Sequence, residues 1–326
     1  MILLTGGAGF IGSNIAADLN AAGVTDMVIA DTLGVDEKWR NIAKRRFDDF
    51  IFPAEIEAFL GARSDVSAVI HMGAISSTTA RDGDEIIRAN FRCSTRLWDW
   101  CARHRRPLIW ASSAATYGAG ERGFVDDDSD AALDSLRPLN LYGWSKHAFD
   151  RWALEQARKG FAPPQWAGLK FFNVYGPNEA HKGDMRSLVA KNTRLVAQGL
   201  ALRLFKSHKA GIADGEQARD FVYVKDCAAV VSWLLANPEV SGLFNLGTGA
   251  ARSFKDLMLA IGKALDKPVA FDFVDTPPSI REQYQYFTQA EMGKLRRAGY
   301  RAPFHSIEDG VRDYVQAYLT QADPFR

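Results

Sequence analysis

The sequence of 326 residues predicts an α/β fold with a doubly wound parallel sheet, and three observations lead to this prediction. Short apolar runs alternate with longer amphipathic segments through the first half, as strands and helices do in such folds. Residues 1–5 form an apolar run, a glycine-rich turn follows at 6–12, and 13–22 has helical spacing. A second apolar run, 27–30, then ends in Asp31. This order is typical of a sheet that binds its ligand at the carboxyl ends of its strands.

The glycine-rich turn has glycines at 6, 9 and 12. Glycine permits a tight turn and a close approach of backbone to a pyrophosphate, which the positive end of the following helix attracts. Asp31 stands 19 residues after Gly12, close to the spacing of an acid that binds a ribose hydroxyl. A glycine triplet alone is weak evidence, and a plain strand–turn–helix is the alternative. In this context the stretch predicts a Rossmann-type dinucleotide site.

Two residues favour different dinucleotides, so the sequence leaves open whether the cofactor is NAD or NADP. Asp31 favours NAD, because an acid at this position binds the ribose hydroxyls, whereas Lys38 favours NADP, because it could reach a 2′-phosphate. A solvated loop lysine is an equal alternative for Lys38, and its spacing alone favours that alternative.

Composition excludes several classes of protein. With 47% hydrophobic and 24% charged residues, the chain can build a large core in one large or two moderate domains. A net charge of +1 argues against nucleic acid and membrane surfaces as partners. No apolar run is long enough to span a membrane and no signal peptide precedes the first strand, so we expect a cytoplasmic protein. Cys93, Cys101 and Cys227 lack metal-ligand spacing, and we expect reduced core thiols and no metal. The acidic run 126–128 is expected to be a solvated loop.

A second strand and turn are expected to lie beside the glycine-rich turn. The run 68–74 reads as a buried strand that ends in the small residues Met72, Gly73 and Ala74. His71 lies in an apolar run, which favours a core histidine over a catalytic one. A long helix is expected over 84–102, where Asn90 needs a partner from backbone or cofactor. Residues 41–64 are expected to be irregular.

Hydroxyl groups crowd the end of the next predicted strand, 107–111, where Ser113 follows. Tyr142 and Lys146 then stand four residues apart on a predicted helix that ends at about 158, so they share one face. An ammonium near a phenol lowers the phenol pKa and allows proton transfer near neutral pH. This pair alone is common in amphipathic helices, but after Ser113 and the glycine turn it indicates an acid/base site.

These motifs resemble the extended short-chain dehydrogenase/reductase family, over the whole chain. The resemblance rests on Thr5-Gly6-x-x-Gly9-x-x-Gly12, on Ser113 and on Tyr142-x-x-x-Lys146. The second half is similar to the ADP-heptose 6-epimerases of that family in its stretches 170–183, 219–224, 244–249 and 283–288, above all in His181-Lys182-Gly183. The resemblance implies inversion at C6 of an ADP-heptose or a related nucleotide sugar through a 6-keto intermediate. It also implies NADP as the usual cofactor, with NAD as the alternative, and a homo-oligomer, for which a pentamer is one option.

The resemblance also implies roles for individual residues. Tyr142 and Lys182 are the two acid/base groups, Ser113 orients the reacting hydroxyl, and Lys146 tunes Tyr142 and holds the nicotinamide ribose. The implied cofactor contacts are Gly6, Gly9, Phe10, Ile11, Gly12, Asp31, Thr32, Lys38, Met72, Gly73, Ala74, Ser76, Asn90, Tyr142, Lys146, Val174 and His181. The implied substrate contacts are Ser113, Asn173, Asp184, Lys191, Phe205, Lys206, Ser207, His208, Arg219 and Tyr284. A guanidinium such as that of Arg219 binds a diphosphate through paired hydrogen bonds.

Four departures from the family pattern concern the nucleotide pocket and the cofactor. Asp184 stands where a small hydroxyl residue is common, and Pro53 where a cofactor-contacting lysine can occur. The stretch 205–208 replaces a more acidic one, and the loop 209–217 looks long.

We expect a cofactor domain and a smaller α/β substrate-binding domain that alternate along the chain. The first is predicted to comprise 1–172 plus about 221–250, and the second about 173–220 plus 251–326. The elements expected after residue 184 are helices over 185–198 and 253–265, strands over 201–205 and 269–274, a strand and helix over 221–236 that return to the large sheet, and two short terminal helices.

Three alternatives follow from the same motifs. A 4,6-dehydratase usually has an Asp-Glu pair where this chain has Ala114-Ala115, and a hexose 4-epimerase needs no second lysine base. A non-catalytic cofactor sensor would tend to lose the Tyr142 and Lys146 pair, which is present here.

Overall fold

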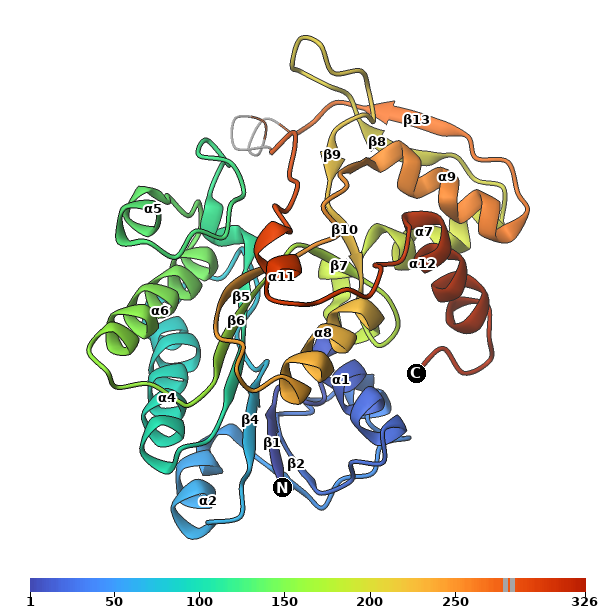
Figure 1. The fold of residues 1–326 in the computed structure, drawn as a ribbon. Coiled ribbons are helices and arrows are strands. Elements are labelled where there is room, and N and C mark those ends of the chain that lie inside the picture. The colour runs from blue at the N-terminus through green and yellow to red at the C-terminus, as the bar shows by residue number, and fades with distance from the viewer. Residues whose placement is uncertain (278–280, 282–284) are drawn as a thin grey trace.

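The computed structural model describes residues 1–277, 281 and 285–326, and Figure 1 shows its fold. Within these residues a seven-stranded sheet has the order β11-β6-β5-β4-β1-β2-β3, and every neighbouring pair is parallel. Its strands are β1 (Ile2–Thr5), β2 (Met27–Ala30), β3 (Asp49–Ile51), β4 (Ala68–His71), β5 (Leu108–Ser113), β6 (Trp166–Phe171) and β11 (Gly242–Leu246). The predicted doubly wound α/β fold is therefore confirmed.

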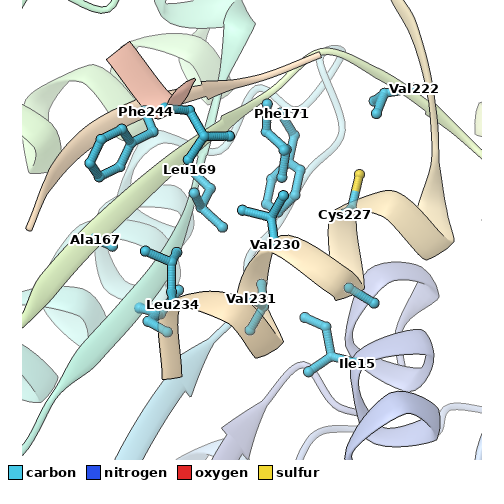
Figure 2. Close-up of a cluster of buried hydrophobic side chains, with 14 of the residues drawn as sticks. Ile15, Ala167, Leu169, Phe171, Val222, Cys227, Val230, Val231, Leu234 and Phe244 are labelled. Carbon is cyan, nitrogen blue, oxygen red and sulfur yellow. The ribbon is translucent and has the colours of Figure 1, made fainter. Parts of the chain in front are cut away.

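Helices cover both faces of this sheet, which is why its strands are continuous apolar runs. On one face, α1 (Phe10–Ala21) packs against α8 (Val224–Ala236). Figure 2 shows α8 between the sheet and α1, with Val230 beside the sheet residue Leu169 and Val231 towards Ile15 of α1. The other face is covered by α2 (Ile56–Ala62), α4 (Cys93–His104) and α6 (Leu141–Arg158), whose buried side chains include Leu60, Trp98 and Phe149.

Two predictions about the first half need correction. The stretch 41–64 is not irregular, since it contains edge strand β3 and helix α2. Only one of the three β3 residues is buried, so the strand leaves little hydrophobic pattern in the sequence. The predicted helix 84–102 is present as α3 (Gly83–Ile86), a π-helical segment at Ile87–Arg92, and α4. Such π segments occur preferentially at functional sites, and Asn90 lies within this one.

The remaining strands form three small two-stranded sheets among the described residues. In these sheets β7 (Asn173–Tyr175) pairs with β10 (Phe221–Tyr223), β9 (Ala218–Arg219) with β12 (Arg252–Ser253), and β8 (Leu202–Phe205) with β13 (Phe271–Val274). Helices α7 (Leu188–Ala197), α9 (Phe254–Leu265) and α12 (Ile307–Tyr314) pack beside them and share one apolar core. This group lies at the upper right of Figure 1.

The predicted strand 201–205, the predicted strand 269–274, and the helix capped by Ser253 are confirmed. The prediction that the strand of 221–236 returns to the large sheet is wrong, because β10 pairs with β7. Helix α8, which follows β10, does cover the large sheet. The next strand, β11, joins the large sheet by pairing with β6.

The shorter helical segments that the structure describes are η1 (Glu37–Asn41), η2 (Pro53–Glu55), η4 (Ala114–Tyr117), α5 (Asp130–Ser135), η5 (Ala180–Met185), α11 (Gly293–Arg297) and η6 (Val315–Leu319). In the described part of the chain, no helix is both long and apolar enough to cross a membrane.

Two glycines bring backbone into direct contact with backbone after β1. Gly6 has a φ of +66°, and a Cβ on it would lie 2.5 Å from the amide nitrogen of Gly73. A Cβ on Gly12 would lie 2.1 Å from the carbonyl oxygen of Gly6. Any side chain at either position would separate the turn after β1 from its neighbours.

We therefore expect Gly12→Ala to lower the free energy of unfolding by about 1–3 kcal/mol, since the methyl group overlaps backbone that cannot give way. Gly61→Ala is the matched control, because a methyl group there meets nothing within 4 Å. Urea unfolding of both variants tests this, and equal midpoints would contradict it.

Candidate active site

The carboxyl ends of β1 and β4 meet, as the sequence predicted. The amide of Met72 donates to the carbonyl of Thr5 over 3.0 Å, and the amide of Gly73 donates to its hydroxyl over 3.2 Å. Gly6 packs against this second turn without any side chain between. The two turns thus form one continuous backbone surface at the ligand edge of the sheet.

A cavity of about 890 Å³ begins at this edge. Its lining includes Gly6, Asp31, Lys38, Gly73 and Ala74, and it continues along α2 and α4. Its size lies within the range of roughly 300–1,000 Å³ that is usual for small-molecule sites. The cavity thus opens beside the glycine turn, where the sequence predicts the dinucleotide site.

Asp31 and Lys38 are bonded to each other. The Asp31 carboxylate accepts the amide of Ala8 over 2.9 Å, the amide of Thr32 over 2.7 Å, and the ammonium of Lys38 over 2.6 Å. Lys38 also donates to the carbonyl of Thr32 over 2.7 Å. The interpretation of Lys38 as a solvated loop lysine is therefore wrong, since it forms an ion pair with Asp31 and lines the cavity.

Asn90 finds its partners in the protein itself. Its side-chain oxygen accepts the amide of Ile75 over 2.8 Å, and its nitrogen donates to the Ile75 carbonyl and to the Ser145 hydroxyl, each over 3.0 Å. It thereby joins the turn after β4 to helix α6, next to Lys146.

His71 is a core histidine, as favoured. One ring nitrogen lies 2.6 Å from the Thr5 hydroxyl and the other 2.8 Å from the Ser94 hydroxyl. Burial lowers its pKa to about 3, with a smaller contribution from the charge of Lys146. A permanently neutral ring is suited to holding β1, β4 and α4 together.

Ser113, Tyr142 and Lys146 come together where β5 ends and α6 begins. The Ser113 hydroxyl accepts the amide of Ala115 over 3.1 Å and hydrogen-bonds the Tyr142 phenol. Helix α6 begins after Asn140, whose side chain accepts the amide of Gly143 over 2.8 Å. This cap fixes the first turn of the helix, which carries Tyr142.

The electrostatics of this group differ from the prediction in one respect. Burial lowers the pKa of Lys146 to about 8. Burial also raises the pKa of Tyr142 above its usual value, and the hydrogen bond from Ser113 only partly opposes this rise. The expectation that Lys146 brings the phenol pKa towards neutrality is not met in the polypeptide alone, because Lys146 is not among the influences on Tyr142 and desolvation of the phenolate is the largest of them.

Lys182 lies on η5, and its ammonium is 5.1 Å from the centre of the Phe10 ring at the start of α1. Burial lowers its pKa, while the charge of Glu179 opposes this. The neighbouring His181 lies 3.1 Å from the Asn41 amide nitrogen, and burial lowers its pKa to about 4, with further lowering by Lys38 and Lys182. The η5 segment is thus joined to the segment that carries Lys38.

The other predicted cofactor residues are distributed along the same edge. Gly9 precedes α1, Phe10 and Ile11 form its first turn, and Met72 and Ala74 follow β4. Thr32 and Ser76 are exposed, and Val174 is half-buried on β7.

Apart from Ser113 at the end of β5, the predicted substrate residues that the structure describes lie in two groups on the smaller part of the fold. Phe205, Lys206, Ser207 and His208 end or follow β8, where Lys206 lies 3.6 Å from Asp275. The amide of Ser207 donates to Asp214 over 2.7 Å, and the amide of His208 to the Tyr286 phenol over 3.1 Å.

The second group comprises Asn173 on β7, Arg219 on β9, Asp184 on η5 and Lys191 on α7. Asn173 is exposed, whereas Arg219 is buried with its guanidinium 5.5 Å from the Phe254 ring. The Lys191 ammonium donates to the backbone carbonyl of Asp184 over 2.5 Å. Tyr284 lies outside the described residues.

Two further expectations need correction. Asp126 is buried rather than solvated, because its carboxylate accepts the amide of Asn245 over 2.9 Å and ties the acidic loop to β11. Cys101 and Cys227 are buried free thiols, but Cys93 is only half-buried and lines the cavity.

Sequence reasoning missed a buried pair next to this site, formed by Asp150 of α6 and Lys170 of β6. A signal for Asp150 was available, since it stands four residues after Lys146 and therefore on the same helix face. Lys170 left a weaker signal, as a lone charge within the apolar run of a strand.

We expect Asn90→Ala to lower the free energy of unfolding by about 1–3 kcal/mol, because the amide and carbonyl of Ile75 and the Ser145 hydroxyl each lose a hydrogen bond to it. Asn192→Ala is a suitable control, since that half-buried side chain donates only to the Leu188 carbonyl. Urea unfolding that finds the same loss for both variants would contradict the expectation.

Comparison with known proteins gives a consistent result. The model of the NAD dependent epimerase/dehydratase family matches residues 2–247. The ADP-L-glycero-D-manno-heptose-6-epimerase of Nitratidesulfovibrio vulgaris strain DP4 is 48% identical over 328 residues, and that of Fusobacterium nucleatum subsp. nucleatum is 46% identical over 334, each covering 100% of both chains.

Two solved structures have the same fold. The ADP-L-glycero-D-manno-heptose-6-epimerase of Helicobacter pylori aligns with a TM-score of 0.77 at 24% identity, covering 97% of this chain and 95% of that one. The UDP-glucose 4-epimerase of Thermus thermophilus, in complex with NAD, aligns with a TM-score of 0.73 at 26% identity, covering 95% of this chain and 96% of that one.

Proposed function

The chain belongs to the NAD dependent epimerase/dehydratase family, and from this premise we propose that it inverts C6 of ADP-D-glycero-β-D-manno-heptose to give the L-glycero epimer. The observation that carries the proposal is the full-length likeness to relatives named as ADP-L-glycero-D-manno-heptose-6-epimerases. The site supports it, because Lys182 offers a second acid/base group besides Tyr142. The product is a heptose precursor for the lipopolysaccharide core.

Inversion without net oxidation requires that C6 lose a hydride from one face and regain it on the other. The bound nicotinamide supplies this hydride chemistry. The C6 hydroxyl must give up its proton as the 6-keto sugar forms, and the carbonyl oxygen must receive one as the hydroxyl returns. The sugar is presented in two orientations, so each needs its own proton partner, and Tyr142 and Lys182 serve one each.

Ser113 and Lys146 prepare Tyr142 for its part. Ser113, already bonded to the Tyr142 phenol, orients the reacting hydroxyl towards it. Lys146 would hold the nicotinamide ribose with its ammonium. The raised pKa of Tyr142 suits it to donate a proton, and a positive charge brought close to the phenol lowers that pKa for the reverse role.

Lys182 must be neutral in part of the cycle in order to accept a proton. Its burial beside the Phe10 ring supports this role, because desolvation lowers the pKa of an ammonium. A lysine that only bound phosphate would gain from staying charged and solvated.

We expect Lys182→Met and Tyr142→Phe each to reduce epimerisation by at least about 100-fold, the usual contribution of a positioned acid or base. Each variant should still oxidise one of the two epimers, since the other base remains, and reduced nicotinamide should accumulate with that epimer only. Anion-exchange chromatography of the ADP-heptose epimers and the absorbance of reduced nicotinamide measure the two effects.

Lys159→Met is the control, because that lysine is exposed at the end of α6 and pairs with Glu155. Full epimerisation by Lys182→Met would remove Lys182 from the mechanism. Failure of the unaltered chain to convert ADP-heptose, with cofactor bound, would overturn the proposed substrate.

For the cofactor, we propose NADP, with NAD as the weaker ligand. The geometry that supports this is the Asp31–Lys38 pair, in which the ammonium already occupies the carboxylate that would otherwise bind the ribose hydroxyls. A 2′-phosphate would take Lys38 as its counter-ion at the same place. Pro53 contributes no charge there.

We expect Lys38→Met to raise the Kd of NADP by about 10- to 100-fold, the loss of one charge-assisted hydrogen bond, and to leave the Kd of NAD unchanged or lower, because Asp31 becomes free for the ribose. Lys44→Met is the control, since Lys44 pairs with Asp323 2.8 Å away. Titration calorimetry with both dinucleotides decides this, and an equal change for both would refute the 2′-phosphate role.

We also propose a cofactor domain of 1–172 plus about 221–250 and a substrate domain of about 173–220 plus 251–326. The course of the chain supports this, because β11 joins the large sheet while β8, β9, β12 and β13 do not. A cytoplasmic homo-oligomer is the assembly that the family resemblance implies.

A further inference from the structure

A buried ion pair lies one helical turn beyond Lys146. Asp150 of α6 is 0% exposed and Lys170 of β6 is 1% exposed, and their nearest charged atoms are 3.9 Å apart. Asp150 follows Lys146 by four residues and Tyr142 by eight, so all three lie on one face of α6.

Each member of the pair holds a different piece of the chain around β5. The Asp150 carboxylate accepts the Ser112 hydroxyl over 2.5 Å and the Trp110 indole over 3.1 Å, both from β5. The Lys170 ammonium donates to the Thr116 hydroxyl over 3.1 Å and lies 4.5 Å from the centre of the Tyr117 ring, both in η4.

Ser113 is held between these two anchors. Its neighbour Ser112 is bonded to Asp150, and its own carbonyl accepts the Thr116 hydroxyl over 2.8 Å. Since Thr116 is in turn bonded to Lys170, the backbone of Ser113 is fixed on both sides.

We propose that Asp150, with Lys170 as its counter-ion, is a positioning residue of the acid/base site: it fixes Ser113 at the end of β5 and places its carboxyl group one helical turn from Lys146. This inference rests on the function proposed above for Ser113, Tyr142 and Lys146.

Stability of the fold alone does not explain such a pair. Apolar side chains of similar volume often serve a core as well as a buried ion pair, because desolvation of the two charges offsets their attraction. The pair lies beside Lys146, however, where a fixed negative charge has a direct effect on proton equilibria.

Several titratable groups lie near Lys146, and Asp150 is the carboxyl group among them that raises its pKa. Burial lowers the pKa of Lys146 to about 8, and the charge of Asp150 is the larger of the two influences that raise it. The other is Cys93 beside the cavity, a thiol whose own pKa burial raises, so it carries no charge near neutral pH. His71 on β4 is neutral for the same reason.

The surroundings of Asp150 act on its pKa in opposite directions. Burial raises its pKa, and the charge of Lys170, the hydrogen bonds from Ser112 and Trp110, and the charge of Lys146 all oppose this. Asp150 also raises the pKa of Tyr142 and of Tyr117. Burial prevails, so the Asp150 pKa lies above its usual value, while the two donors and the ammonium are the partners that favour its ionised form.

Three variants separate positioning from folding: Asp150→Asn, Lys170→Met and the double variant. Asp150→Asn alone leaves the Lys170 charge buried without its partner, so it should unfold at lower urea concentration. The double variant removes both charges and should recover most of that loss. Any defect that persists in the double variant is therefore not a consequence of poor folding.

The discriminating readout is the titration of Lys146, followed by NMR in the full chain labelled at lysine ¹³Cε, with Lys146→Arg identifying its resonance. We expect the Lys146 pKa to fall in Asp150→Asn and in the double variant. Turnover should show the same order, with kcat reduced at least tenfold at unchanged KM for the nucleotide sugar.

The inference would be overturned if Lys146 titrated at the same pH in the double variant as in the unaltered chain and kcat were also unchanged. The NMR arm needs no substrate. A fall of the Lys146 pKa in a chain that does not epimerise ADP-heptose would therefore support the electrostatic role of Asp150 while refuting the proposed function.

Discussion

Direct packing of backbone against backbone, where β1 and β4 end, is the contact on which the ligand edge depends. Gly6 touches the Met72–Gly73 peptide, and Gly12 touches the carbonyl of Gly6. This approach aligns the N-terminus of α1 with the turn after β4. The neutral ring of His71 fixes the same place from within the core, through Thr5. Both turns line the cavity, and the glycine turn also holds Asp31, through the amide of Ala8.

Desolvation is the second general feature of the site. Burial lowers the pKa of three lysines near it, Lys146, Lys170 and Lys182, and raises that of the Tyr142 phenol. Each of these groups therefore gives up or accepts a proton at a different pH than it would in water. A parallel sheet that is covered by helices on both faces excludes water from its interior. Polar side chains at the ends of its strands lie next to this interior and are partly desolvated. At Lys146, the charge of Asp150 raises the pKa and so opposes part of the lowering that burial causes.

Much of the site was predictable because its signals are local. The glycine turn, the acid after β2, and the Tyr142 and Lys146 pair are each defined by spacing within a single strand, turn or helix. The fold class followed from the same alternation. Edge strand β3 and helix α2 were missed, because a short strand that is mostly exposed carries little hydrophobic pattern. The pairing of β10 with β7 was missed because register between distant segments leaves no trace in either one.

The sequence by itself determined the elements and their chemistry: a dinucleotide turn, a tyrosine and lysine on one helix face, and a second lysine directly before Gly183. Only the tertiary structure decided which charges meet. It bonded Asp31 to Lys38, paired Asp150 with Lys170, and raised rather than lowered the pKa of Tyr142. The physical reason is that proton affinity depends on solvent exclusion and on charges brought together from different elements. Neither exists until the sheet and its helices have packed.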